Sequence, residues 1–232
     1  MHVELIKKFT MEAAHRVPLA DGGGARLHGH SYIIEIVAEG EIDPLSGWLI
    51  DFGDIKKAFA PLYEQLDHHC LNDVPGLDDA TCEGIGAWIY DRLKEPLPLL
   101  HAVRVSISGD NEFIPVELEA DPVARLPRRI QFKFEAAQSL PHLPPKHPCR
   151  RLHGHTYVVE IGADNLERLS RRLKALYDML DHRYLNEVQG LDEATSERLC
   201  YWIWSYLSET IDDLSVVVVQ ETATSRCIYR GK

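Results

Sequence analysis

The stretch Arg-Leu-His-Gly-His at residues 26–30 recurs, letter for letter, at residues 151–155. Three neighbouring blocks recur with it in the same order. They are F-T-M-E-A-A-H at 9–15 and F-K-F-E-A-A-Q at 132–138, L-D-H at 66–68 and 180–182, and G-L-D-D-A-T at 76–81 and G-L-D-E-A-T at 190–195. Four ordered blocks indicate that one structural unit is present twice.

Hydrophobic periodicity predicts the same elements in both copies. Stretches rich in β-branched and aromatic residues indicate strands, and apolar residues at helical spacing indicate helices. Thr81 and Thr195 suit the N-cap of a second helix in each copy. The predicted strands are 3–9, 31–38, 103–107 and 214–220, and the predicted helices are 54–66, 81–93, 166–180 and 195–207. The fold class is α+β, with two tandem units, each an antiparallel sheet with two helices on one face.

The boundaries follow from the repeat. We expect a first copy at residues 1–110, a linker at 111–128 and a second copy at 129–232. The linker contains three prolines and several acidic residues, and periodicity fades there. The second copy is shorter between its H-G-H and L-D-H blocks, and the missing piece matches residues 41–48, which resemble a surface turn.

Composition excludes some classes of partner. The 232 residues carry a formal net charge of -11, which argues against a nucleic-acid binder. No apolar run reaches membrane-spanning length, and the N-terminus lacks the pattern of a signal peptide. The five cysteines form no C-x-x-C pair. We therefore expect a reduced, cytoplasmic protein with no nucleic-acid or membrane partner.

Three histidines of the first copy form a candidate zinc site. His28 and His30 are two residues apart and would project from one face of a strand, and a hairpin can bring His15 beside them. Three imidazoles leave a fourth zinc position open for water or substrate. The alternative is three unrelated histidines, which the repetition of the block disfavours. The second copy offers a weaker set, in which an amide replaces the first imidazole: Gln138, His153 and His155.

An aspartate–histidine pair follows the first helix of each copy. The pairs are Asp67 with His68 and Asp181 with His182. An aspartate beside a histidine can tune it for proton transfer. The alternative, which local sequence alone favours, is a histidine that interacts with the dipole at a helix C-terminus.

Cys149 lies four residues before His153 in a polar, proline-rich stretch. Its cationic neighbours include Arg150 and Arg151, and such neighbours favour the thiolate. The alternative is the ordinary role of a free cysteine as a small apolar residue. The polar surroundings make that alternative less suitable here.

Together these motifs resemble a known enzyme family. F-x-x-E-A-A-H, C-x-x-x-H-G-H, L-D-H, G-L-D-x-x-T and the terminal Q-E-T-x-x-x-x-C-I-Y-R-G are similar to the 6-pyruvoyl- and 6-carboxy-tetrahydropterin synthases. The cysteine spacing and the terminal block look most like the 6-carboxytetrahydropterin synthases of queuosine biosynthesis. The resemblance covers nearly the whole chain.

The resemblance implies a tunnelling fold, whose units assemble into rings, and hence a homotrimer of this two-unit chain. It implies the substrate 7,8-dihydroneopterin triphosphate, with zinc on three histidines binding the side-chain hydroxyls. It also implies a cysteine thiolate that moves protons, assisted by an Asp–His pair from a neighbouring unit, and a glutamate that anchors the pterin ring. Triphosphate is eliminated, and the carboxy branch also cleaves the side chain.

Carried over residue by residue, the family's functional residues are split between the copies. The first copy has the zinc histidines, but Gly24 and Ile107 stand at the positions of the cysteine and the glutamate. The second copy has Cys149 and Glu221, but its first metal position is Gln138. The implied catalytic residues are Cys149, Asp67, His68, Asp181 and His182, and the implied substrate-binding residues are Glu221, Thr195, Arg150 and Arg151.

Two functions follow as hypotheses. One is a zinc-dependent lyase acting on dihydroneopterin triphosphate. The other is a non-catalytic zinc- and pterin-binding protein descended from such an enzyme, which the loss of a histidine at Gln138 favours. A zinc hydrolase is less suitable, because no glutamate is placed as a general base beside His28 and His30. The sequence leaves open which Asp–His pair serves Cys149.

Overall fold

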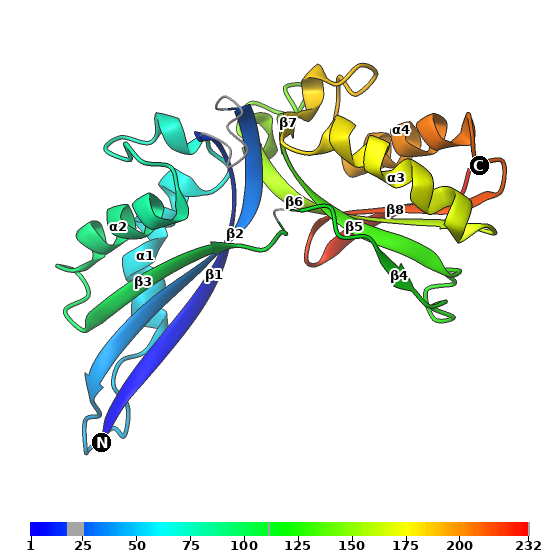
Figure 1. Cartoon of the computed structure of the whole chain (residues 1–232). Helices are drawn as coiled ribbons and strands as arrows, with labels where there is room; N and C mark the ends of the chain where they lie inside the picture. Colours follow the sequence, from blue (N-terminus) through cyan, green and yellow to red (C-terminus); the bar gives the residue numbers. More distant parts are fainter. Residues whose placement is uncertain (18–25, 111, 232) are drawn as a thin grey trace.

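The computed structural model describes residues 1–17, 26–110 and 112–231. Its first unit contains a three-stranded antiparallel sheet in the order β1-β2-β3, with α1 and α2 on one face (Figure 1). Its elements are β1 (His2–Val17), β2 (Arg26–Glu41), α1 (Phe52–Leu66), the 3-10 helix η1 (Leu71–Asp73), α2 (Cys82–Leu93) and β3 (Leu100–Ile107).

The second unit repeats this arrangement with extra strands. Its sheet has the order β4-β5-β6-β8-β9, the short β7 pairs with β5, and α3 and α4 cover one face (Figure 1). Its elements are β4 (Val116–Leu118), β5 (Arg129–Gln138), η2 (Pro148–Arg150), β6 (His153–Ala163), α3 (Leu166–Leu180), β7 (Arg183–Tyr184), η3 (Leu185–Glu187), α4 (Ser196–Ser208), β8 (Leu214–Thr222) and β9 (Ser225–Tyr229).

The predicted α+β class and the two antiparallel units are confirmed, but several strands are longer than predicted. β1 and β2 are 16 residues each, so the hairpin extends through the histidine blocks. The stretch expected to be a linker contributes β4, which pairs with β5. β4 lies at the edge of the sheet and, among the described residues, is paired on one side only.

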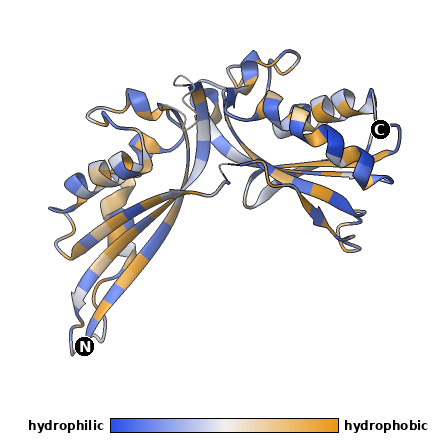
Figure 2. Ribbon diagram, viewed as in Figure 1, coloured by the Kyte–Doolittle hydropathy of each residue, from blue (hydrophilic) through white to orange (hydrophobic). Residues whose placement is uncertain are grey.

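Each unit has its own apolar core between sheet and helices. Hydrophobic and hydrophilic residues both occur along the strands and on each helix (Figure 2), and the buried apolar residues form one large cluster in each unit. Both predicted N-caps are present: Thr81 accepts from the Gly84 amide at 3.2 Å, and Thr195 accepts from the Arg198 amide at 3.3 Å. Among the described residues, no helix is both long and apolar enough to cross a membrane.

The two units meet where β2 and β6 pack together. A Cβ atom added to Gly29 would lie 2.3 Å from the Cα of Gly154, closer than real contacts allow. Glycine is therefore required at both positions for the two backbones to approach this closely. Just beyond them, the Ser31 and Thr156 amides each donate to the other residue's hydroxyl at 3.1 Å. Both histidine blocks consequently lie at this junction.

Candidate active sites at the junction of the two units

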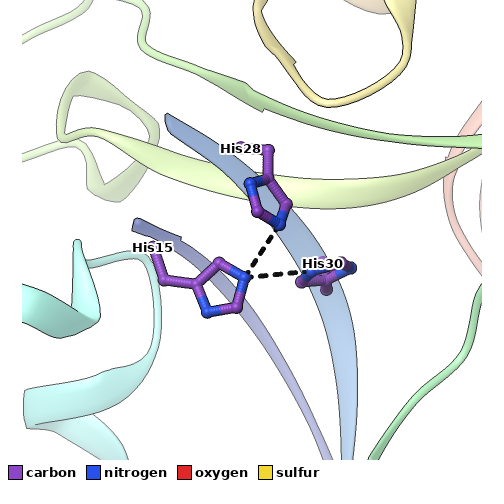
Figure 3. Close-up of side chains that lie close together, drawn as sticks. All are labelled: His15, His28 and His30. Carbon is purple, nitrogen blue, oxygen red and sulfur yellow. Dashed lines mark hydrogen bonds between the residues drawn. The ribbon is translucent and has the colours of Figure 1, made fainter. Parts of the chain in front are cut away.

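The first site consists of His15, His28 and His30, whose Nε2 atoms converge (Figure 3). Strand register brings them together, because His15 on β1 is paired with His28 on β2. His15 Nε2 lies 3.0 Å from His28 Nε2 and 3.1 Å from His30 Nε2. Tetrahedral zinc would separate such nitrogens by roughly 3.3 Å, so the spacing suits a metal ion.

The outer nitrogens explain why the inner ones face each other. His15 Nδ1 donates to the Ala80 carbonyl at 2.8 Å, and His28 Nδ1 donates to the Arg26 carbonyl at 2.9 Å. A carbonyl can only accept, so both Nδ1 atoms carry the proton of the neutral ring. The Nε2 lone pairs of these two histidines then point at one another, an arrangement that a cation between them stabilises.

Electrostatics keep these rings in the form that binds metals. Burial, together with repulsion from neighbouring histidines, lowers the pKa of His15 to about 4 and that of His28 to about 2. Burial lowers the pKa of His30 to about 3. Neutral imidazole is the metal ligand, so the donor set fits the expected ion.

The second unit completes the first site. Its His182 ring lies against His28, with ring centroids 4.4 Å apart, and Asp181 Oδ2 lies 2.6 Å from His182 Nδ1. Glu135 of β5 lies 2.7 Å from His30 Nδ1. No cysteine is part of this group among the described residues. The cysteine-equivalent Gly24 lies outside the described residues, and Ile107 is on β3, paired with Tyr32.

The second site is the equivalent group of the second unit. Gln138 on β5 is paired with His153 on β6, and His155 follows two residues later. Glu221 of β8 approaches this group: its carboxylate accepts from the Gln138 amide group and from the Ser196 hydroxyl. Its Oε1 lies 3.0 Å from His155 Nε2. The carboxylate implied to anchor a pterin thus lies at the histidines in this structure.

Cys149 faces the Asp–His pair of the first unit. Ligand atoms of Cys149, His68 and His153 all lie within 4.8 Å of one another, and Asp67 Oδ2 is 2.8 Å from His68 Nδ1. Burial lowers the pKa of His68, but hydrogen bonds to Asp67 and Cys149 outweigh it and raise the pKa to about 9. Within this chain, Asp67 and His68 thus lie at Cys149, whereas Asp181 and His182 lie at the first site.

Each unit also contributes a glutamate to the site of the other unit, and neither glutamate was predicted from the sequence. Glu12 of the first unit lies 2.8 Å from His155 Nδ1, just as Glu135 of the second unit contacts His30. Although burial lowers the pKa of His155, the carboxylates of Glu12 and Glu221 raise it to about 9. The only signal in the sequence was the glutamate shared by the two E-A-A blocks. Carboxylates in this position orient metal-binding histidines.

Backbone conformation at the two Asp–His pairs is also repeated. His68 and His182 have φ values of 57° and 53°, which are uncommon for residues other than glycine. Their amides donate to the carbonyls of Glu12 and Glu135 at 2.7 and 2.6 Å. The same contacts hold both turns, and such conformations persist where the surroundings impose them.

Three other predicted site residues have hydrogen-bond partners within the chain. Arg150 donates to the carbonyls of its own loop, Pro141 and Leu143. Arg151 Nε donates to the His68 carbonyl at 2.9 Å, linking the loop of Cys149 to the opposite unit. Thr195 caps α4. Their roles toward a substrate stay predictions.

Fold and sites together define a duplicated α+β protein with two histidine-rich sites at its junction. A family model described as 6-pyruvoyl tetrahydropterin synthase matches residues 4–116 and again residues 128–232. The chain belongs to this family and carries the family's unit twice.

Three curated relatives illustrate the relation. The chain is 40% identical over 107 residues to a 6-carboxy-5,6,7,8-tetrahydropterin synthase of Synechocystis, covering 44% of this chain and 83% of that protein. It is 37% identical over 120 residues to a dihydroneopterin monophosphate aldolase of Pyrococcus furiosus, covering 51% and 99%. It is 36% identical over 126 residues to the 6-pyruvoyl tetrahydrobiopterin synthase of Homo sapiens, covering 47% and 87%. Most of each relative thus corresponds to about half of this chain.

Proposed function

We propose that this protein is a zinc-dependent, 6-carboxytetrahydropterin synthase-like lyase that acts on 7,8-dihydroneopterin triphosphate at the second site. The observation that carries the proposal is the group formed by Cys149, His68 and Asp67 across the junction, beside His153. It combines a thiol, an imidazole and an orienting carboxylate. That is the arrangement of an activated nucleophile or proton carrier.

In this proposal the residues of the chain have separate tasks. Cys149, as thiolate, removes a proton from a side-chain carbon of the substrate, and His68 stabilises the thiolate and receives or returns the proton. Asp67 holds His68 through Nδ1, which fixes the ring orientation and favours its charged form. A bound zinc ion would polarise the hydroxyls of the substrate side chain.

The test is turnover of dihydroneopterin triphosphate by the full chain, with products resolved by mass. Cys149→Ala should abolish turnover while leaving pterin binding largely intact, because a positioned acid or base typically contributes about 10²–10⁴-fold. His15→Ala, the control in the first site, should lower zinc content without the same loss of turnover. Normal turnover by Cys149→Ala together with loss of turnover by His15→Ala would assign the chemistry to the first site.

The absence of a histidine at Gln138 favours a second candidate function. In that case the chain binds zinc and a pterin without converting it. Wild-type protein that binds dihydroneopterin triphosphate but releases neither triphosphate nor a cleaved side chain would support this alternative. Released carboxy-tetrahydropterin would support the enzyme and a place in queuosine biosynthesis.

We also propose a homotrimer of this two-unit chain in the cytoplasm, so that six units close a ring. Two strands, β1 and β3, form the edges of the first sheet among the described residues. Edge strands have unpaired backbone groups, which favour pairing with another chain. Oligomers formed in this way usually have closed symmetry. Light scattering at micromolar concentration tests this, and a monomer would contradict it.

A further inference from the structure

A carboxylate approaches the two histidines of the second site, whereas the first site has a third histidine. We propose that, in the substrate-free protein, Glu221 is the third protein ligand of a divalent transition-metal ion held by His153 and His155. Ligand atoms of these three residues all lie within 4.8 Å of one another. The inference concerns metal binding alone and does not depend on the proposed lyase activity.

Both histidines are oriented for this role. His153 Nδ1 donates to the Arg151 carbonyl at 2.8 Å, and His155 Nδ1 lies 2.8 Å from the Glu12 carboxylate. Their outer nitrogens are therefore engaged, and their Nε2 atoms are directed into the site. His153 is fully buried and His155 is 2% exposed, so bulk water does not solvate these nitrogens.

Two buried atoms of this site have no hydrogen-bond partner among the described residues: His155 Nε2 and Gln138 Oε1. His155 Nε2 lies 3.0 Å from Glu221 Oε1, without the alignment of a hydrogen bond. Gln138 is fully buried. Burying such atoms without a hydrogen-bond partner is unfavourable, which indicates that a further group binds at this site.

A cation accounts for these atoms better than a proton does. A proton on His155 Nε2 would lie beside the Glu221 carboxylate, but Gln138 Oε1 would still lack a partner. A metal ion accepts the Nε2 lone pairs and the carboxylate together, and a water bound to it can donate to Gln138 Oε1. The Gln138 amide group and the Ser196 hydroxyl both donate to Glu221, which holds the carboxylate in position.

The donor set defines the class of ion. Two imidazoles and one carboxylate bind zinc in hydrolases, and the same set binds iron(II) and related ions. It carries more negative charge than the three imidazoles of the first site. Gln138 has the role of an orienting donor here, not that of the ligand expected from the sequence.

The experiment counts metal in the full chain. Protein stripped with a chelator is dialysed against Zn²⁺ alone, and bound zinc per chain is measured by mass spectrometry. Two ions per chain are expected for the wild type. Glu221→Ala should retain one, because losing a protein ligand should weaken the second site by at least about 10–100-fold. Glu209→Ala, which removes an exposed carboxylate at the end of α4, is the matched control and should retain two.

A rescue variant separates a ligand from a merely structural residue. Gln138→His restores the third imidazole, so Gln138→His with Glu221→Ala should again bind two ions. A variant lacking His28 and His30 should retain one ion, and adding Glu221→Ala should remove it. If Glu221→Ala binds as much zinc as the wild type, or the wild type binds one ion only, the proposal is overturned. Co²⁺ absorption from the second site provides an independent readout.

Discussion

The two sites at the junction differ in which functional side chains each one contains. In the first, three neutral imidazoles converge, and the residues expected to supply a thiol and a pterin anchor are Gly24 and Ile107. In the second, a thiol and a carboxylate accompany two imidazoles, and an amide replaces the third. Both sites receive an Asp–His pair and an orienting glutamate from the opposite unit. Duplication therefore allowed the sites to diverge while keeping the two units dependent on each other.

The largest expected effect tests whether the Asp–His pairs are equivalent. His68→Ala should lower turnover by about 10²–10⁴-fold, because His68 is the proton-transfer partner of Cys149. His182→Ala removes the equivalent ring, which lies against His28, and should change turnover by less than about tenfold. Steady-state rates of the two variants, measured side by side, decide the matter. A greater loss for His182→Ala would mean that the first site is the active one.

The next effect concerns the contact that joins the sites. Gly154→Ala would place a Cβ 2.2 Å from the Cα of Gly29, so we expect the free energy of unfolding to fall by about 3 kcal/mol. Gly86→Ala is the control, since its Cβ would come no closer than 3.4 Å to its neighbours. Denaturant unfolding of both variants tests the prediction. A loss below about 0.5 kcal/mol for Gly154→Ala would show that the junction can open without penalty.

The sequence predicted most of each unit but little of the junction. Repeated blocks and local periodicity identified the principal strands, the helices α1 to α4 and both N-caps, because these depend on neighbours in the chain, but the short strands β4, β7 and β9 were not predicted. The partner of Cys149 could not be predicted, since His68 reaches it only through the close packing of Gly29 against Gly154. The same holds for the glutamates that contact the other unit's histidines. A contact between units has no fixed spacing in the sequence.

A smaller effect tests those two glutamates. Glu135→Gln should weaken zinc binding at the first site by about tenfold, because an amide replaces the carboxyl group that orients His30. Glu12→Gln should weaken metal binding at the second site by a similar factor through His155. Competition with a coloured chelator measures both affinities. If Glu135→Gln instead weakens metal binding at the second site, and Glu12→Gln at the first, the prediction that each glutamate orients a histidine of the other unit is wrong.

The smallest effect compares the two helix caps. Thr81 and Thr195 each accept from an amide three residues ahead, so replacing either by alanine should lower the free energy of unfolding by about 1 kcal/mol. Serine keeps the hydroxyl and should restore most of the loss. The resemblance to pterin enzymes adds a substrate-binding role for Thr195 alone. Thr195→Ala should therefore also raise KM for the pterin, whereas Thr81→Ala should leave KM unchanged. Equal KM values in the two variants, with equal losses of stability, would leave Thr195 only its role as a cap.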